Sequence, residues 1–433
     1  MSGGTPVDKA GLTPAPAAES AAPPARERLA SLDAFRGFDI LTMVFVNFIA
    51  AMTGIPFILR HAPAAMDAFT LTDWVFPGFL FMVGVSIPLA LAKRKQTGEP
   101  APRLLGHVVV RTLALLFLGL IEVNHHRFSA ADTGLSEPLW YFLAYGAVFA
   151  LWAGTPKNAG PRRKNIQLGL RIAAAALLIA LVVIFRGKGE DGVVTWLQHS
   201  WWGILGMIGW TYFAGSVLYI FSKGNRTALA GAIGLMTALY IGSRHGALDF
   251  LGPVNRFLEH GVGSIFGSHT AIVTAGMLAG TLFLPGSGLS KPKDRVRFLS
   301  ILGMVLLAAG YVLRPLHGFS KIGGTESWAL ATAGISCLVF LFFYILLDLL
   351  KLSRAAAFLV PVGRNPLAAY LLPDQIGNIL VLAGGLLHVD LWRAVWPFGE
   401  KGGWPGMLNA AVMTALVLFL TTLLTRAKVV LKL

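Results

Sequence analysis

Cysteine and charged residues are the two classes of residue that this sequence has little of. Its 433 residues include one cysteine, Cys337, so neither an intramolecular disulfide nor a cysteine-based metal site is available. Only 13% of the residues are charged, whereas a soluble globular protein has about 25%. Gly-rich phosphate loops and GxSxG or HExxH motifs are also absent. These absences exclude a disulfide-built secreted domain and make a soluble enzyme a poor interpretation.

Apolar residues take the place of the missing charge and make up 55% of the chain. A membrane-spanning helix needs about 20 mostly apolar residues. Twelve runs approach this length, near residues 38–56, 74–92, 104–123, 138–154, 166–185, 203–221, 227–243, 269–285, 297–314, 328–350, 366–387 and 407–425. The runs at 138–154 and 227–243 are short, so eleven spans is the alternative count. The sequence predicts an all-α integral membrane protein, a polytopic bundle of 11 or 12 transmembrane helices.

The net charge of +15 comes from 36 Lys and Arg against 21 Asp and Glu. In a soluble protein this balance would suggest a nucleic-acid partner. Here the basic residues form short clusters between apolar runs, which is how membrane topology signals look, so we expect a lipid bilayer and no nucleic acid. Most clusters fall on one side if the N-terminus is cytoplasmic, and the positive-inside rule then places both termini in the cytoplasm.

The chain divides into a tail and one membrane domain. Residues 1–30 are expected to form a disordered cytoplasmic tail, because Ala, Pro, Gly and Ser dominate positions 1–27. No short apolar segment with a small-residue cleavage site precedes residue 38, so we expect no cleaved signal peptide. Residues 31–433 are expected to form the transmembrane domain. The Ala- and Arg-rich composition and the lack of cysteine pairs favour a bacterial inner (plasma) membrane.

The first span carries an unusual number of polar residues. Asp33, Arg36 and Asp39 recur at i,i+3 spacing and share one helix face. They form either an ion-paired helix start, with Asp33 as N-cap, or part of a cofactor site, since ionisable residues inside spans are usually paired or functional. Asn47 lies further along the same helix, and it either bonds a neighbouring helix or orients a reacting group.

His61 and Asp73 lie in the polar segment that follows Pro56. Histidine takes up a proton near neutral pH, so His61 is a candidate general base toward a hydroxyl or an amine, although most loop histidines have no such role. Lys321, in FSKIGGTESW, lies in an outer loop and either contacts an acidic or sugar substrate or is simply solvated. We expect no metal site, because His125-His126 lacks nearby carboxylate or thiol ligands.

The sequence resembles the transmembrane acyltransferases of the heparan-α-glucosaminide N-acetyltransferase type. Their opening signature is matched by RLASLDAFRG, then MVFVN, a histidine after Arg60, and LTDWVFPGFLFMVGVSI. Later pieces in the same order are WWGILGMIGWTYF, HTAIVTAGMLAG, FSKIGGTESWALATAGIS and GRNPLAAY. The resemblance runs from about residue 28 to residue 375. It implies an acyl-CoA-dependent enzyme that moves an acetyl group from cytoplasmic acetyl-CoA to an amine or hydroxyl of a sugar or glycan outside, and it is compatible with a homodimer.

The resemblance also implies roles for single residues. His61 matches the family's active-site histidine, and Asn47 matches the asparagine that helps to position it. Asp33 and Arg36 match an Asp-x-x-Arg-Gly element and are expected to bind the cofactor. Asp73 and Lys321 are expected to contact the substrate. His61 either acts as a general base or becomes acylated itself, and Asn47 would donate a hydrogen bond to the thioester carbonyl.

Two features depart from the family pattern, and both flank the acceptor side. The family's Trp-Asn-Gly after the histidine is replaced by residues 64–67, AAMD, and the segment from His61 to Asp73 is longer. Asn47 and His61 are also more widely spaced. These departures argue against a heparan glucosamine acceptor and leave acyl-CoA chemistry standing.

Two matters stay open in the sequence. The CoA phosphates should remain at the cytoplasmic mouth near Arg36, with Lys93, Arg94, Lys95 and Arg364 either as further partners or as plain topology signals. The alternative function is a polytopic transporter or flippase for a sugar or lipid-linked substrate. Against it, no internal repeat is visible, and carriers are commonly built from paired halves. Binding of acyl-CoA would separate the two functions.

Overall fold

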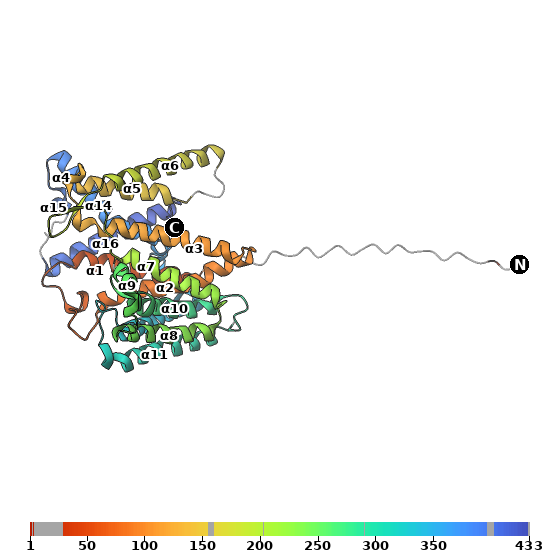
Figure 1. Ribbon diagram of the computed structural model, residues 1–433. Helices are drawn as coiled ribbons and strands as arrows, with labels where there is room; N and C mark the ends of the chain where they lie inside the picture. Colours follow the sequence, from red (N-terminus) through yellow and green to blue (C-terminus); the bar gives the residue numbers. More distant parts are fainter. Residues whose placement is uncertain are drawn as a thin grey trace.

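The computed structural model describes residues 1, 3, 29–154, 160–201, 203–289, 291–395 and 402–431. Most of the predicted tail lies outside the described residues. The longer helices are α1 (Ala30–Ile49), α2 (Leu71–Gln96), α3 (Ala101–Val123), α5 (Glu137–Trp152), α6 (Pro161–Ile184), α7 (Ile204–Phe221), α8 (Arg226–Arg244), α10 (Thr270–Gly280), α11 (Pro292–His317), α12 (Glu326–Phe343), α14 (Pro366–Leu387) and α16 (Gly403–Arg426). In Figure 1 they run lengthwise across the molecule, so the loops lie at its two ends.

Short elements connect or extend these helices. The short α-helices are α4 (Ala130–Thr133), α9 (Gly252–Leu258), α13 (Leu359–Arg364) and α15 (Leu391–Val395). The 3₁₀ turns are η1 (Phe57–Leu59), η2 (His125–Arg127), η3 (Asp249–Leu251), η5 (Thr281–Phe283) and η7 (Ser353–Ala356), and the π-helical segments are η4 (Gly263–His269) and η6 (Tyr344–Leu349). Strands β1 (Gly187–Lys188) and β2 (Val194–Thr195) pair antiparallel, with Gly187 opposite Thr195.

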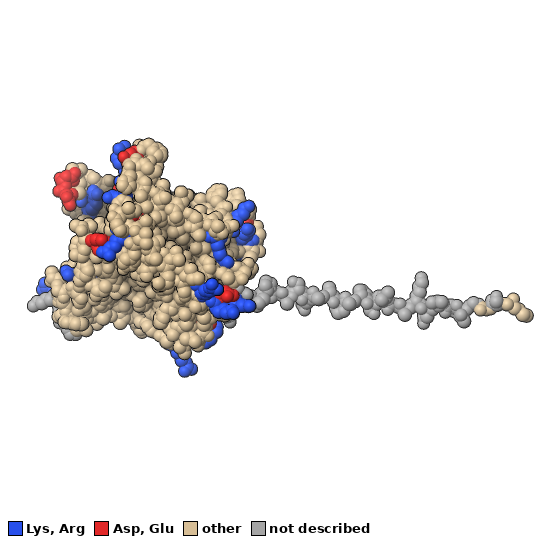
Figure 2. Space-filling view, turned by 90° about the horizontal axis from the view of Figure 1, so that it is seen from below, with Lys and Arg blue, Asp and Glu red and all other residues tan. Residues whose placement is uncertain are grey.

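The predicted fold class is confirmed, since each of the twelve apolar runs corresponds to a helix. Within the described ranges, nine helices are long and apolar enough to cross a membrane. The three other long helices fall short for local reasons: α1 carries three ionisable side chains, α5 has 16 residues, and α8 begins and ends with arginine. Figure 2 shows one face whose middle is almost entirely uncharged, with charged groups toward its edges, as expected of a surface that contacts lipid.

The first helix differs from its prediction at both ends. It begins at Ala30, before the predicted N-cap at Asp33, and it ends at Ile49, before the predicted stop at Pro56. Asp33 is not its N-cap, because Leu29 holds that position and the Asp348 carboxylate accepts the N–H groups of Ala30 and Ser31 at 3.3 and 3.2 Å. A distant side chain therefore caps the helix, and Asp33 is left buried in the first turn.

Small residues let the central helices approach closely, as is common in membrane bundles. A methyl group at Gly84 of α2 would lie 2.0 Å from the Val273 carbonyl oxygen, and one at Gly276 of α10 would lie 2.0 Å from the Phe81 carbonyl oxygen. The segment 263–283 is almost entirely buried, and α10 contacts α2, α7, α8 and α12. This segment forms the core against which the site is built.

Candidate functional site

The start of α2 holds a histidine–carboxylate pair. Thr70 caps the helix and forms a capping box with Asp73, which fixes that carboxylate in the first turn. Asp73 Oδ1 lies 2.7 Å from His61 Nδ1, and Oδ2 accepts the backbone N–H groups of Ala62 (3.0 Å) and Thr70 (3.1 Å). Asp73 is 1% exposed and the His61 side chain is 39% exposed. The pair therefore has one buried and one accessible member.

The hydrogen bonds define the tautomer of His61. A carboxylate that accepts several N–H groups acts as an acceptor, so His61 Nδ1 carries a proton and donates it to Asp73. In the neutral ring, Nε2 then carries the lone pair. This arrangement of a buried carboxylate behind an accessible imidazole is the one that suits a general base or a nucleophile.

Lys321 approaches the same imidazole from the loop between α11 and α12. Its Nζ lies 3.3 Å from His61 Nε2 and 3.4 Å from Nδ1. Burial lowers the pKa of Lys321 to about 8, although the nearby Asp73 carboxylate acts in the opposite direction. The structure thus brings together His61, Asp73 and Lys321, three residues that the sequence placed far apart.

The segment that departs from the family pattern anchors this lysine loop. Asp67 Oδ1 accepts the N–H of Phe319 at 2.6 Å, and this bond lowers the pKa of Asp67. Its Oδ2 accepts from Arg314 Nε at 2.9 Å. The rings of Phe69 and Phe319 pack edge to face at 5.1 Å. Asp67 and Phe69 therefore hold the Lys321 loop against the His61 loop.

A cavity of about 60 Å³ lies behind Lys321. It is lined by Phe76, Ile204, Met207, His269 and Lys321. His269 is 1% exposed, and its Nδ1 lies 2.9 Å from the Ser264 carbonyl oxygen, which orients the ring. Sequence reasoning did not select His269, although a histidine that opens an apolar run is the signal that would have found it.

A larger chamber of about 520 Å³ shares Ile204 with this small cavity. Apolar side chains line most of it, and three arginines enter it: Arg36, Arg94 and Arg111. The Arg111 guanidinium lies 4.8 Å above the ring of Tyr212, which also lines the chamber. Sequence reasoning passed over Arg111, although a single arginine inside the apolar run HVVVRTLALLF marks a functional candidate.

Arg36 is fixed where α1 meets α2 and α13. It donates to the Gly363 carbonyl oxygen at 3.0 Å and to Ser86 Oγ at 2.8 Å. Asp33 lies 3.6 Å from Arg36 and 3.5 Å from Arg364. The Asp-x-x-Arg-Gly element is thus an ion-paired helix junction and also places one arginine in the chamber.

Asn47 lies in a different cavity, of about 250 Å³. It lines this cavity with Glu122, Tyr370 and Asp374, and Glu122 accepts a hydrogen bond from the Tyr370 hydroxyl. Tyr370 also lines the large chamber. Asn47 therefore lies in a cavity that borders the chamber at Tyr370, and not in the cluster of His61 and Lys321. Its role in positioning His61 stays a prediction.

Within the described ranges, no group of three or more His, Cys, Asp and Glu side chains is arranged to hold a metal ion. The groups that remain are a chamber with three arginines in its lining and a histidine–carboxylate pair with a lysine beside it.

These features define an all-α, polytopic membrane protein that has a chamber with three arginines in its lining and, separately, a histidine–carboxylate pair in contact with a lysine. The chain belongs to the family described as "Domain of unknown function (DUF5009)", whose match covers residues 28–249. It is 40% identical to human heparan-alpha-glucosaminide N-acetyltransferase over 105 residues. The aligned stretch covers 24% of this chain and 15% of the human protein. The mouse protein of the same name is 37% identical over 97 residues, or 22% and 14% of the two chains. The chain thus matches about a seventh of the length of these relatives.

Proposed function

We propose that this protein is a membrane-embedded acyltransferase. It takes acetyl-CoA from the cytoplasm and transfers the acetyl group to an amine or hydroxyl of a sugar or glycan on the outer side of the membrane. The observation that carries the proposal is the His61–Asp73 pair, whose imidazole contacts Lys321, a residue that lines the small cavity next to the chamber with three arginines. The names of the two partly similar relatives support the same class of reaction.

The chamber suits the donor because its walls match the two halves of acetyl-CoA. Pantetheine is a thin and mostly neutral arm, for which the apolar walls from α2, α3 and α7 leave room. The phosphates require countercharge, and Arg36, Arg94 and Arg111 provide planar guanidinium donors for them. In this assignment the arginine end of the chamber faces the cytoplasm, together with both chain termini, and the membrane is a bacterial inner membrane.

The acceptor reacts at the outer end. His61 Nε2 accepts a proton from the acceptor amine or hydroxyl while the acceptor atom forms a bond to the thioester carbonyl carbon. The carbon–sulfur bond then breaks, and the CoA thiolate leaves and takes up a proton. Asp73 keeps His61 in the tautomer with a free Nε2 and stabilises the imidazolium that forms, as the carboxylate does in a Ser-His-Asp triad.

Lys321 stabilises the negative charge that develops on the carbonyl oxygen. Its ammonium touches His61 Nε2 and also lines the small cavity behind the ring. An arriving acceptor displaces the ammonium from Nε2, which frees the base and leaves the positive charge beside the reacting carbonyl. Stabilisation of the negatively charged oxygen in the transition state is usually the largest single contribution to the rate enhancement.

The test uses purified protein in detergent with acetyl-CoA and a panel of amino sugars and hydroxylated sugars. We expect sugar-stimulated release of free thiol by the wild type and its loss in His61→Ala. The matched control is His126→Ala, a histidine of η2 outside the cluster, which should retain activity. Thiol release at the same rate in His61→Ala would contradict the role of His61. Failure of the wild type to bind acetyl-CoA would contradict the enzyme and favour transport.

A further inference from the structure

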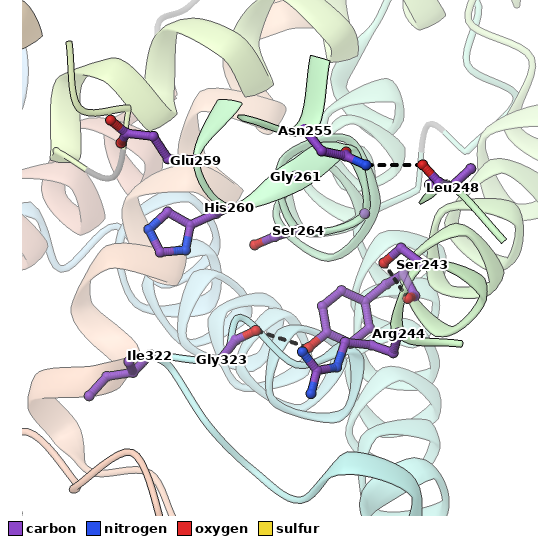
Figure 3. Close-up of a pocket in the computed structure, with 12 residues that line it drawn as sticks. Ser243, Arg244, Leu248, Asn255, Glu259, His260, Gly261, Ser264, Ile322 and Gly323 are labelled. Carbon is purple, nitrogen blue, oxygen red and sulfur yellow. Dashed lines mark hydrogen bonds between the residues drawn. The ribbon is translucent and has the colours of Figure 1, made fainter. Parts of the chain in front are cut away.

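A fourth cavity, lined mainly by polar residues, opens beside the lysine loop. It has a volume of about 370 Å³, within the range of roughly 300–1,000 Å³ typical of small-molecule sites. Figure 3 shows Glu259 and His260 on one side of it and Ser243 and Arg244 on the other, with Ile322 and Gly323 from the lysine loop below. The lining thus combines hydroxyl, amide and charged groups, which suits a ligand with many hydroxyls.

This cavity adjoins the reaction site through two connections. Ile322 and Gly323 directly follow Lys321, and the Gly323 carbonyl oxygen accepts a hydrogen bond from Tyr240 at 2.9 Å, which fixes the loop to α8. Ser264 lines the cavity, and its carbonyl oxygen holds the His269 ring. A ligand in the cavity therefore lies against the loop that carries Lys321.

Most polar groups around the cavity already form hydrogen bonds within the protein, and Arg244 is the exception. Asn255 bonds Leu248 and Val262 within the loop, and Glu259 Oε2 accepts the N–H of Trp201 at 3.1 Å. Burial lowers the pKa of His260, although the nearby Glu259 acts in the opposite direction. Arg244 is exposed and lines the cavity, and it has no hydrogen-bond or ion-pair partner among the residues that the structure describes. Its guanidinium has a full set of donors for a ligand.

We infer that this cavity binds the acceptor, and that Arg244 selects a sugar that carries an anionic group: a carboxylate, a sulfate or a phosphate. The inference rests on the proposed function for the idea that an acceptor enters from this face. A guanidinium fork binds such groups through two parallel hydrogen bonds, which gives both affinity and orientation. The hydroxyls of Tyr240, Ser243 and Ser264 and the imidazole of His260 are near enough to the cavity to bind the sugar. Arg244 would thus be a specificity-determining residue rather than a catalytic one.

The test compares glucosamine with glucosamine 6-phosphate and glucosamine 6-sulfate, which share one amine and differ in the anionic group. Binding to the wild-type protein in detergent is measured by calorimetry, and thiol release from acetyl-CoA is measured in parallel. We expect an anionic probe to bind at least tenfold more tightly than glucosamine, because a charge-assisted bond contributes about that much. Arg244→Gln should abolish the preference, and Arg244→Lys should restore part of it. Arg256→Gln, an exposed arginine of α9 outside the lining, should leave it unchanged.

The outcomes separate this inference from the proposed function. A wild type that binds none of the anionic probes more tightly, or a preference that survives Arg244→Gln, overturns the inference even if thiol is released. Binding that depends on Arg244 without any thiol release supports the sugar site and overturns the acyltransferase. An unchanged affinity of Arg244→Gln for acetyl-CoA shows that the variant is folded and that its donor site is intact.

Discussion

Replacing Asp73 with asparagine tests the central pair with the smallest change in shape. The asparagine oxygen can take the place of Oδ2 and keep the hydrogen bonds from the N–H groups of Ala62 and Thr70. These groups lie 3.0 and 3.1 Å from Oδ2 in the wild type. Its NH₂ group then faces His61 Nδ1 at the present 2.7 Å contact. Two donors cannot face each other, so His61 would move its proton to Nε2. The variant would therefore hold the imidazole in the tautomer that cannot accept a proton.

The size of the effect follows from these contacts. Holding a histidine in the wrong tautomer costs about 10⁴-fold in kcat in a serine-protease triad, so we expect a loss of roughly 10³–10⁴-fold for Asp73→Asn. Stability should fall much less, because one charge-assisted bond becomes a neutral one and the others remain, a loss of roughly 1–2 kcal/mol. The assay is sugar-dependent thiol release, with the melting temperature in detergent as the test of folding.

The matched control is Asp191→Asn. Asp191 Oδ1 also accepts a backbone N–H, that of Val193 at 3.1 Å, but it lies in the exposed turn between β1 and β2. This variant should keep wild-type activity. A folded Asp73→Asn protein with kcat within tenfold of the wild type would refute the reasoning that the pair sets the proton of His61.

Three further predictions address the lysine, the chamber and the helix packing. Since the pKa of Lys321 lies at about 8, its ammonium is lost as the pH rises through that value; kcat should fall there in the wild type, and Lys321→Gln should be slower and lack this step in its pH profile. Arg111→Gln should raise the KM for acetyl-CoA about tenfold but not that for acetyl-pantetheine, which has no CoA phosphates; an equal rise for both donors would contradict phosphate binding. A methyl group at Gly363 would lie 1.7 Å from the Asp33 carbonyl oxygen, whereas one at Gly385 meets nothing within 4 Å; Gly363→Ala should therefore lose roughly 3 kcal/mol and lower the melting temperature, and Gly385→Ala should leave it unchanged.

Much of the fold could be predicted because the bilayer imposes a simple rule on the sequence. Every backbone group in lipid must be bonded within its own segment, so a long apolar run has to be a helix. The short runs at 138–154 and 227–243 are helices as well. The predicted start of α1 was wrong because Asp348, more than 300 residues away in the chain, accepts the N–H groups of its first turn. A local pattern carries no information about a cap of that kind.

The sequence by itself determined the helical membrane class and pointed to His61, Asp73, Lys321 and Arg36 as polar residues that an apolar bundle would not hold without a reason. Only the tertiary structure decided how they combine. It joins His61 to Asp73 and Lys321, because loops that follow α1 and α11 are tied together by Asp67. It gathers three arginines from three helices into one chamber, and it places Asn47 in another cavity. The spacing of residues along the chain determines which of them are neighbours on one helix. Contacts between helices depend on packing and on loop geometry, which cannot be predicted from the local sequence.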